Sequence, residues 1–154
     1  EEDMVKQASE FAGTVPVRHL LPYWKTSNRY LFSGGSVNMR DAAVYAKEEN
    51  WSKAVELWKQ TYETKKGRQK MYAAYNTALG YEMQDSIDTA LEWALKAQTL
   101  AREKSKTDKK ETGEIHDGTI SYYIFISMYV DELEKRKEGM ARLNMQMNRF
   151  DDDF

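Results

Sequence analysis

A stretch in the middle of the chain repeats its own residue pattern after 36 positions. Four identities mark the repeat: Ala42 with Ala78, Tyr45 with Tyr81, Ala54 with Ala90, and Glu56 with Glu92. A small residue in the middle of a helix lets a second helix approach closely, and a tyrosine three positions later fills the space beside the crossing. The repeat therefore predicts two helical hairpins that share one geometry.

The periodicity of the apolar residues agrees with these hairpins. Four segments fit the helical period and are predicted to be helices: residues 41–50, 51–63, 69–84 and 86–104. Asn50 and the pair Asp85-Ser86 stand where helix N-caps are expected, because their side-chain oxygens can accept from free backbone N–H groups. The linkers between the helices are very short, so consecutive helices are expected to run antiparallel.

These residues resemble the tetratricopeptide repeat (TPR), a helix-turn-helix unit of about 34 residues. The second unit, residues 75–81 and 87–93, is similar to the family pattern over nearly its whole length, and the first, residues 42–58, is similar but weaker. The family's glycine at the tight crossing is alanine in both units, and its closing proline is missing. The resemblance covers residues 37–104 and implies an all-α fold of antiparallel helical hairpins stacked as a short TPR-like solenoid. An ordinary helical bundle is the alternative.

The first 36 residues are expected to form an N-terminal helix and an extended segment. Residues 2–12 fit one short helix that Gly13 ends, and an irregular stretch is expected from Val15 to Pro22. Residues 30–32 are predicted to be a short strand closed by a turn. One strand cannot stabilise itself, so we expect it to pair with something absent from this chain or to lie against the helices.

The residues after the repeats are expected to form a linker, a cap and a tail. Residues 102–117 hold five basic and five acidic residues whose charges cancel, which favours a solvated linker over residues 105–118. Residues 119–148 are predicted to form one or two capping helices, since a stack needs its apolar end covered. Gly139 either ends the first of these helices or weakens it. Residues 149–154 are predicted to be a disordered tail.

Composition argues against several classes of function. The chain has 23 Lys and Arg against 25 Asp and Glu, a net charge of −2, and no basic stripe, so a nucleic-acid partner is not expected. It has no cysteine and no apolar run long enough for a membrane span. Its two histidines, His19 and His116, lie too far apart in sequence to suggest a metal site. No phosphate-binding glycine loop or nucleophile elbow is present, so we expect no catalytic residue, no cofactor and no metal.

The TPR resemblance implies a peptide-binding groove, because the first helices of successive TPR units line a concave face. The residues that it places there are Met39, Arg40, Ala43, Lys47, Tyr75, Asn76, Leu79, Glu82 and Met83. Asn76 stands at the family position whose amide can hydrogen-bond the backbone of a bound peptide. Arg40 and Lys47 could meet an acidic or carboxylate-ended segment. The alternative is that Tyr75 and Leu79 pack against another helix of the same chain.

These features predict a non-catalytic helical-repeat scaffold that mediates protein–protein or interdomain interaction. Its partner would be a protein, a peptide or the chain's own upstream domain. The chain starts with Glu1 rather than Met, so we expect it to be a piece of a longer protein.

A second hypothesis comes from the segment before the repeats. Residues 22–24, 29–30 and 33–35, followed by TPR-like helices, resemble an uncharacterised family of bacterial envelope lipoproteins. In that family a further domain precedes the helices. The resemblance implies a structural C-terminal part of a larger protein of the bacterial cell envelope, with the activity in the preceding domain.

Overall fold

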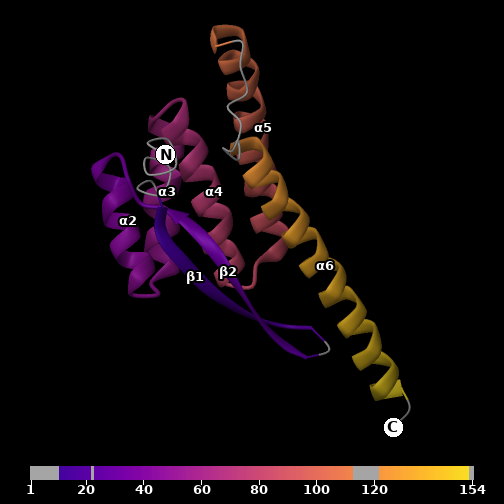
Figure 1. The fold of residues 1–154 in the computed structure, drawn as a ribbon. Helices are drawn as coiled ribbons and strands as arrows, with labels where there is room; N and C mark the ends of the chain where they lie inside the picture. Colours follow the sequence, from indigo (N-terminus) through magenta and orange to yellow (C-terminus); the bar gives the residue numbers. More distant parts are fainter. Residues whose placement is uncertain (1–10, 22, 113–121, 153–154) are drawn as a thin grey trace.

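The computed structural model describes residues 11–21, 23–112 and 122–152 (Figure 1). These residues form a small two-stranded sheet followed by helices: β1 (Phe11–Leu20), β2 (Trp24–Phe32), α2 (Val37–Lys47), α3 (Trp51–Thr64), α4 (Arg68–Met83), α5 (Ile87–Thr112) and α6 (Tyr122–Asp152). Each helix packs against the next one along the chain, and β2 lies against α4 and α2. The fold is therefore mostly helical, with a small antiparallel sheet on its N-terminal side.

The four helices expected from the periodicity are confirmed as α2 to α5. The first begins earlier than predicted, at Val37, where the Ser36 hydroxyl accepts from the backbone N–H of Met39. Asn50 caps α3 as expected, accepting from the backbone N–H of Lys53. The four alanines of the repeat, Ala42, Ala54, Ala78 and Ala90, are all fully buried. Small residues therefore do stand where the helices meet.

A glycine of α4, Gly80, lies directly against side chains of α3. A Cβ atom added to Gly80 would lie 2.3 Å from Cγ2 of Val55 and 3.3 Å from the Trp58 ring. Both of these α3 side chains are buried. Gly80 therefore lets the side chains of Val55 and Trp58 pack directly against the backbone of α4.

Helix α4 is the centre of the molecule. All ten residues from 71 to 80 are buried, because α3, α5 and β2 pack against this helix and side chains of α6 contact its aromatic residues. A helix covered on every side has no amphipathic stripe, and small residues alternate with aromatic ones along α4. On this helix, Tyr75, Asn76 and Glu82 form hydrogen bonds to β2 or α6.

The expectation of an irregular stretch from Val15 to Pro22 was wrong, because β1 covers most of it. β1 pairs antiparallel with β2, with Leu20 opposite Trp24 and Pro16 opposite Asn28. Pro16 is tolerated there because a two-stranded sheet has only edge strands. The partner of β2 is thus part of this chain, which corrects the expectation of pairing with something absent. The expectation that the strand lies against the helices is confirmed.

The flanking helices are longer than the sequence analysis predicted. α5 continues to Thr112, into the segment expected to be a linker, and residues 113–121 lie outside the described part. α6 passes through Gly139 without a break and reaches Asp152, so the expected disordered tail is wrong for residues 149–152. Of the helix expected at residues 2–12, residues 2–10 lie outside the described part, and residues 11 and 12 belong to β1.

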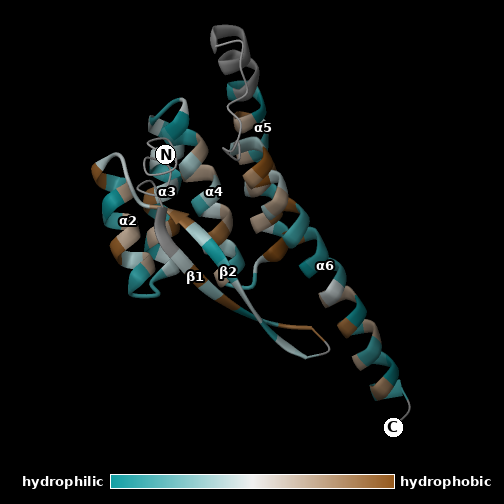
Figure 2. Cartoon of the chain, in the orientation of Figure 1, coloured by the Kyte–Doolittle hydropathy of each residue, from teal (hydrophilic) through white to brown (hydrophobic). Residues whose placement is uncertain are grey.

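α6 extends past the other helices together with the tip of the β1–β2 hairpin (Figure 1). Hydrophilic and hydrophobic residues alternate along this projecting part of α6 (Figure 2). None of the described helices contains an 18-residue stretch apolar enough to cross a lipid bilayer.

Candidate functional site

The residues predicted to line a groove separate into two groups. Tyr75, Asn76, Leu79 and Glu82 are almost completely buried on α4, and Met83 is half-buried beside them. On α2, Met39 is buried and Ala43 half-buried, whereas Arg40 and Lys47 are exposed. The structure thus brings the α4 group together beneath β2 and α6, and leaves the two cations of α2 on the surface.

The side-chain amide of Asn76 hydrogen-bonds to the backbone at the end of β2. The Asn76 Nδ2 donates to the carbonyl oxygen of Phe32 at 2.6 Å, and the Phe32 N–H donates to the Asn76 Oδ1 at 3.1 Å. The Tyr75 hydroxyl donates to the carbonyl oxygen of Tyr30 at 2.8 Å. Helix α4 therefore binds the backbone of an extended segment, and that segment belongs to the same chain.

The side chain of Phe32 anchors the same segment in an aromatic cluster. Its ring stacks on Tyr72 with 4.1 Å between the centroids and meets Tyr75 edge-on at 5.2 Å. Phe125 of α6 lies edge-on at 6.1 Å. Since Phe32 is fully buried, β2 contributes to the core as well as to the sheet.

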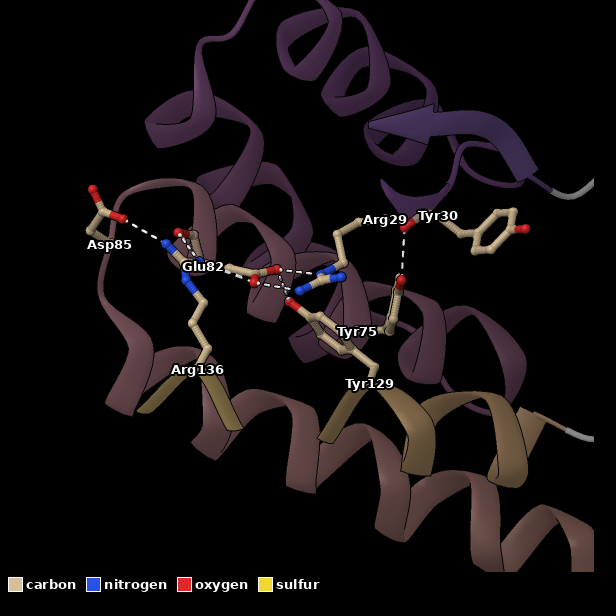
Figure 3. Close-up of polar contacts among 7 residues, drawn as sticks. All are labelled: Arg29, Tyr30, Tyr75, Glu82, Asp85, Tyr129 and Arg136. Carbon is tan, nitrogen blue, oxygen red and sulfur yellow. Dashed lines mark hydrogen bonds and ion pairs between the residues drawn. The ribbon is translucent and has the colours of Figure 1, made fainter. Parts of the chain in front are cut away.

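Glu82 lies at the other end of the α4 face and is buried among three donors (Figure 3). Arg29 of β2 binds both carboxylate oxygens, with its Nε 3.1 Å from Oε1 and its Nη2 3.2 Å from Oε2. The Nη1 of Arg136, from α6, lies 3.0 Å from Oε2, and the Tyr129 hydroxyl donates to Oε1 at 3.0 Å. We call these four residues the Glu82 cluster, and they join α4, β2 and α6.

The charges of the cluster are balanced by one further residue. Arg136 also places its Nη2 2.9 Å from Oδ1 of Asp85, which stands in the turn after α4. The two guanidinium groups therefore face two carboxylates. A buried carboxylate is stable only when it is paired and hydrogen-bonded, and Glu82 meets both conditions.

The pKa shifts in the cluster favour a fixed protonation state. Burial raises the pKa of Tyr129, and the nearby charge of Glu82 raises it further. The same two causes, in the same order, raise the pKa of Tyr75. Burial would lower the pKa of Arg29, but its hydrogen bonds and attraction to Glu82 outweigh this, so the pKa is raised overall. The phenols thus stay protonated donors and Arg29 stays charged, which suits a clamp that holds three elements together.

Glu82 was predicted from the sequence, but its partners Arg29, Tyr129 and Arg136 were not. A signal for the two α6 partners was present. Tyr129, Leu133 and Arg136 follow one another at spacings of four and three, which puts them on one face of a helix. A glutamate on the otherwise apolar and small-residue face of α4 requires such a cation. Arg29 had no comparable signal, because its position depends on how the hairpin folds onto the helices.

Among the described residues, no group of three or more His, Asp or Glu side chains is placed to hold a metal ion. Comparison with protein families gave two matches. The family DUF6340, a domain of unknown function, matches residues 40–135, which is more than half of the chain. The family DUF8603, also a domain of unknown function, matches residues 1–32. Comparison with curated proteins and with solved structures gave no match.

The boundary between the two matched regions falls between the hairpin and the helices. Phe32 and Arg29 lie in the DUF8603 match, whereas Asn76, Glu82 and Arg136 lie in or directly after the DUF6340 match. The hydrogen bonds of Asn76 and Glu82 to β2 therefore connect the two regions.

Proposed function

We propose that this chain, which belongs to the DUF6340 family, is a non-catalytic helical-repeat scaffold that mediates interdomain interaction. The observation that carries the proposal is the pair of hydrogen bonds between the Asn76 amide and the backbone of Phe32. A side-chain amide that binds both polar groups of one extended residue is a device for holding a peptide segment. Here the segment is the hairpin, and the helices are its receptor.

The packing of the helices supports a TPR-like stack as the receptor. α2 with α3 and α4 with α5 form two successive hairpins, the repeat alanines are buried where the hairpins meet, and α6 covers α5. In such a stack the inner face of α4 is the concave side. The bound segment supplies a backbone for Asn76, an aromatic anchor at Phe32 and a cation for Glu82.

The partner that we propose is the domain to which the hairpin belongs. The separate family match over residues 1–32 supports this, because the concave face then holds part of a second unit. The mode of recognition is that of an extended peptide fixed by backbone hydrogen bonds, with pockets for its side chains. The exposed cations Arg40 and Lys47 take no part in this contact.

Cutting the connection between hairpin and helices tests the proposal. A specific protease site is inserted between Gly34 and Gly35, which are exposed, and the cleaved chain is passed over a size-exclusion column. We expect the hairpin fragment to stay with the helices. Asn76→Ala should release it, whereas Arg40→Ala, an exposed control on α2, should not. Release of the hairpin from the otherwise unchanged chain would contradict the proposal.

The second candidate is a structural part of a larger bacterial envelope lipoprotein, with the activity in a preceding domain. The match of two different families to one chain favours it. The coding sequence upstream of Glu1 tests this candidate. We expect it to encode a lipoprotein signal and a further domain, and an initiator codon directly before Glu1 would contradict it.

A further inference from the structure

A cavity of about 460 Å³ lies between the hairpin and α6, beside the Glu82 cluster. Lys25 and Arg29 line it from β2, and Lys135, Arg136 and Arg142 line it from α6. This volume falls within the range of small-molecule sites, and it is much larger than a single inorganic anion needs.

The charge of the cavity walls is positive in a chain whose net charge is −2. Arg29 and Arg136 are balanced by Glu82 and Asp85. The remaining lining charges are the cations Lys25, Lys135 and Arg142 and the carboxylate of Glu132, and when Glu138 beside Arg142 is also counted the net charge is +1. An anionic ligand would therefore be attracted to this cavity.

Two of these cations are held only loosely by carboxylates. The Nζ of Lys135 lies 3.9 Å from Glu132, and the Nη2 of Arg142 lies 3.9 Å from Glu138. Both cationic side chains are more than 70% exposed, at 73% and 74%. Exposed pairs at this distance contribute little, so both side chains can turn toward a ligand at small cost.

Two buried polar residues also belong to the cavity walls. His19 and Arg136 are 6% and 5% exposed, and both line the cavity. The Nδ1 of His19 and the Nε of Arg136 have no hydrogen-bond partner within the described part of the chain. Both nitrogens are themselves shielded from the cavity, so the direct contacts to a ligand are assigned to the exposed cations Lys25, Lys135 and Arg142.

Apolar side chains form another part of the wall. Leu21 and Tyr23, near the tip of the hairpin, line the cavity, and Cδ2 of Leu21 lies directly over Gly139 of α6. A Cβ atom at position 139 would be 2.3 Å from this carbon. The glycine thus lets the hairpin tip approach α6 and brings an apolar surface next to the cations.

We propose that this cavity binds a small organic phosphate ester. Cationic side chains reach the cavity from β2 and from α6, and a tetrahedral phosphate accepts hydrogen bonds in several directions, whereas a carboxylate accepts preferentially near its plane. The organic part of the ester lies against Leu21 and Tyr23. This site is separate from the contact between Asn76 and Phe32, so neither proposal depends on the other.

Binding of phenyl phosphate to the full chain tests this assignment, with inorganic phosphate and benzoate as comparison probes. Calorimetry should give saturable binding of phenyl phosphate that is tighter than that of inorganic phosphate and at least about tenfold tighter than that of benzoate. The NMR ring signals of His19, assigned by their loss in His19→Gln, should shift during the titration. Absence of saturable binding, or equal binding of benzoate, would overturn the assignment.

Matched variants of α6 locate the binding. We expect the double variant Lys135→Gln, Arg142→Gln to bind phenyl phosphate at least about tenfold more weakly than the unchanged chain. The control is Lys137→Gln, which removes one positive charge from the same helix away from the site, since the Lys137 ammonium faces Asp88 at 2.8 Å rather than the cavity. Circular dichroism checks that each variant is folded, as expected for exposed positions. Unchanged affinity of the double variant would place any binding elsewhere and overturn the proposal.

Discussion

Arg29 and Glu82 lie 53 positions apart in sequence and form a bidentate ion pair, with distances of 3.1 and 3.2 Å between their nitrogen and oxygen atoms. Both side chains are buried, at 7% and 0% exposed. One partner belongs to the hairpin and the other to the central helix. The attachment of the sheet to the helices therefore depends on charge as well as on apolar contact.

Replacing Glu82 should destabilise the protein strongly. In Glu82→Gln the guanidinium groups of Arg29 and Arg136 lose the buried carboxylate that balances them. We expect the free energy of unfolding to fall by about 3–5 kcal/mol, measured by urea denaturation. Glu132→Gln is the control, because its pair with Lys135 is exposed and should change the free energy by less than about 1 kcal/mol. A small loss in Glu82→Gln would show that the cluster does not hold the fold.

Replacing Asn76 should loosen the hairpin. Asn76→Ala removes both hydrogen bonds between the Asn76 amide and the buried backbone of Phe32, and removing one partner of a buried hydrogen bond costs about 1–3 kcal/mol. We expect a loss of about 2–4 kcal/mol in the free energy of unfolding and faster hydrogen exchange at the Phe32 amide. The matched control is Asn38→Ala, which removes a surface hydrogen bond to Gln60. Equal exchange rates in the two variants would argue against a special role for Asn76.

Stability should decline at alkaline pH. Burial and the charge of Glu82 raise the pKa of Tyr75 and of Tyr129 above the ordinary value of 10.0. The unfolded chain then releases these protons near pH 10 while the folded chain keeps them, so the stabilisation is present below pH 10 and is lost as the pH rises further. Urea denaturation between about pH 8 and pH 11 should record this decline. Tyr129→Phe should flatten it, and a stability that is constant over this range would contradict the shifts.

Enlarging Gly80 should disturb the crossing of α3 and α4. In Gly80→Ala the new Cβ meets Cγ2 of Val55 at 2.3 Å, and overpacking of this kind costs about 1–3 kcal/mol. Thermal unfolding should show a lower midpoint. Gly34→Ala is the control, since no atom lies within 4 Å of a Cβ there. Val55→Ala removes the side chain that the new Cβ would meet. Gly80→Ala should therefore lower the midpoint less in a Val55→Ala background than in the unchanged chain.

The helices were predictable because their signals are local. The period of the apolar residues and the N-cap at Asn50 need only neighbours in sequence, and the buried alanines follow from the repeat. The strand β1 was missed because Pro16 argued against regular structure, although an exposed edge position tolerates it. Local patterns also could not give the ends of α5 and α6, since polar residues continue a helix as readily as they begin a linker.

The candidate site was predictable only on its helical side. Asn76 and Glu82 were identified from the TPR resemblance, which places them on an inner face. What covers that face depends on contacts between distant segments, such as the one between Phe32 and Asn76, and no local pattern reports these. The sequence likewise could not predict that Lys25 and Arg142 line one cavity, because the cavity exists only once the hairpin tip lies beside α6.

The buried carboxylate at position 82 also limits how such chains can recombine during evolution. A substitute hairpin would have to bring its own guanidinium or ammonium group to Glu82, or the buried carboxylate would keep only Arg136 as a cation, which it shares with Asp85. The helices and the hairpin are therefore expected to be inherited as a unit, even though they fall into two different families.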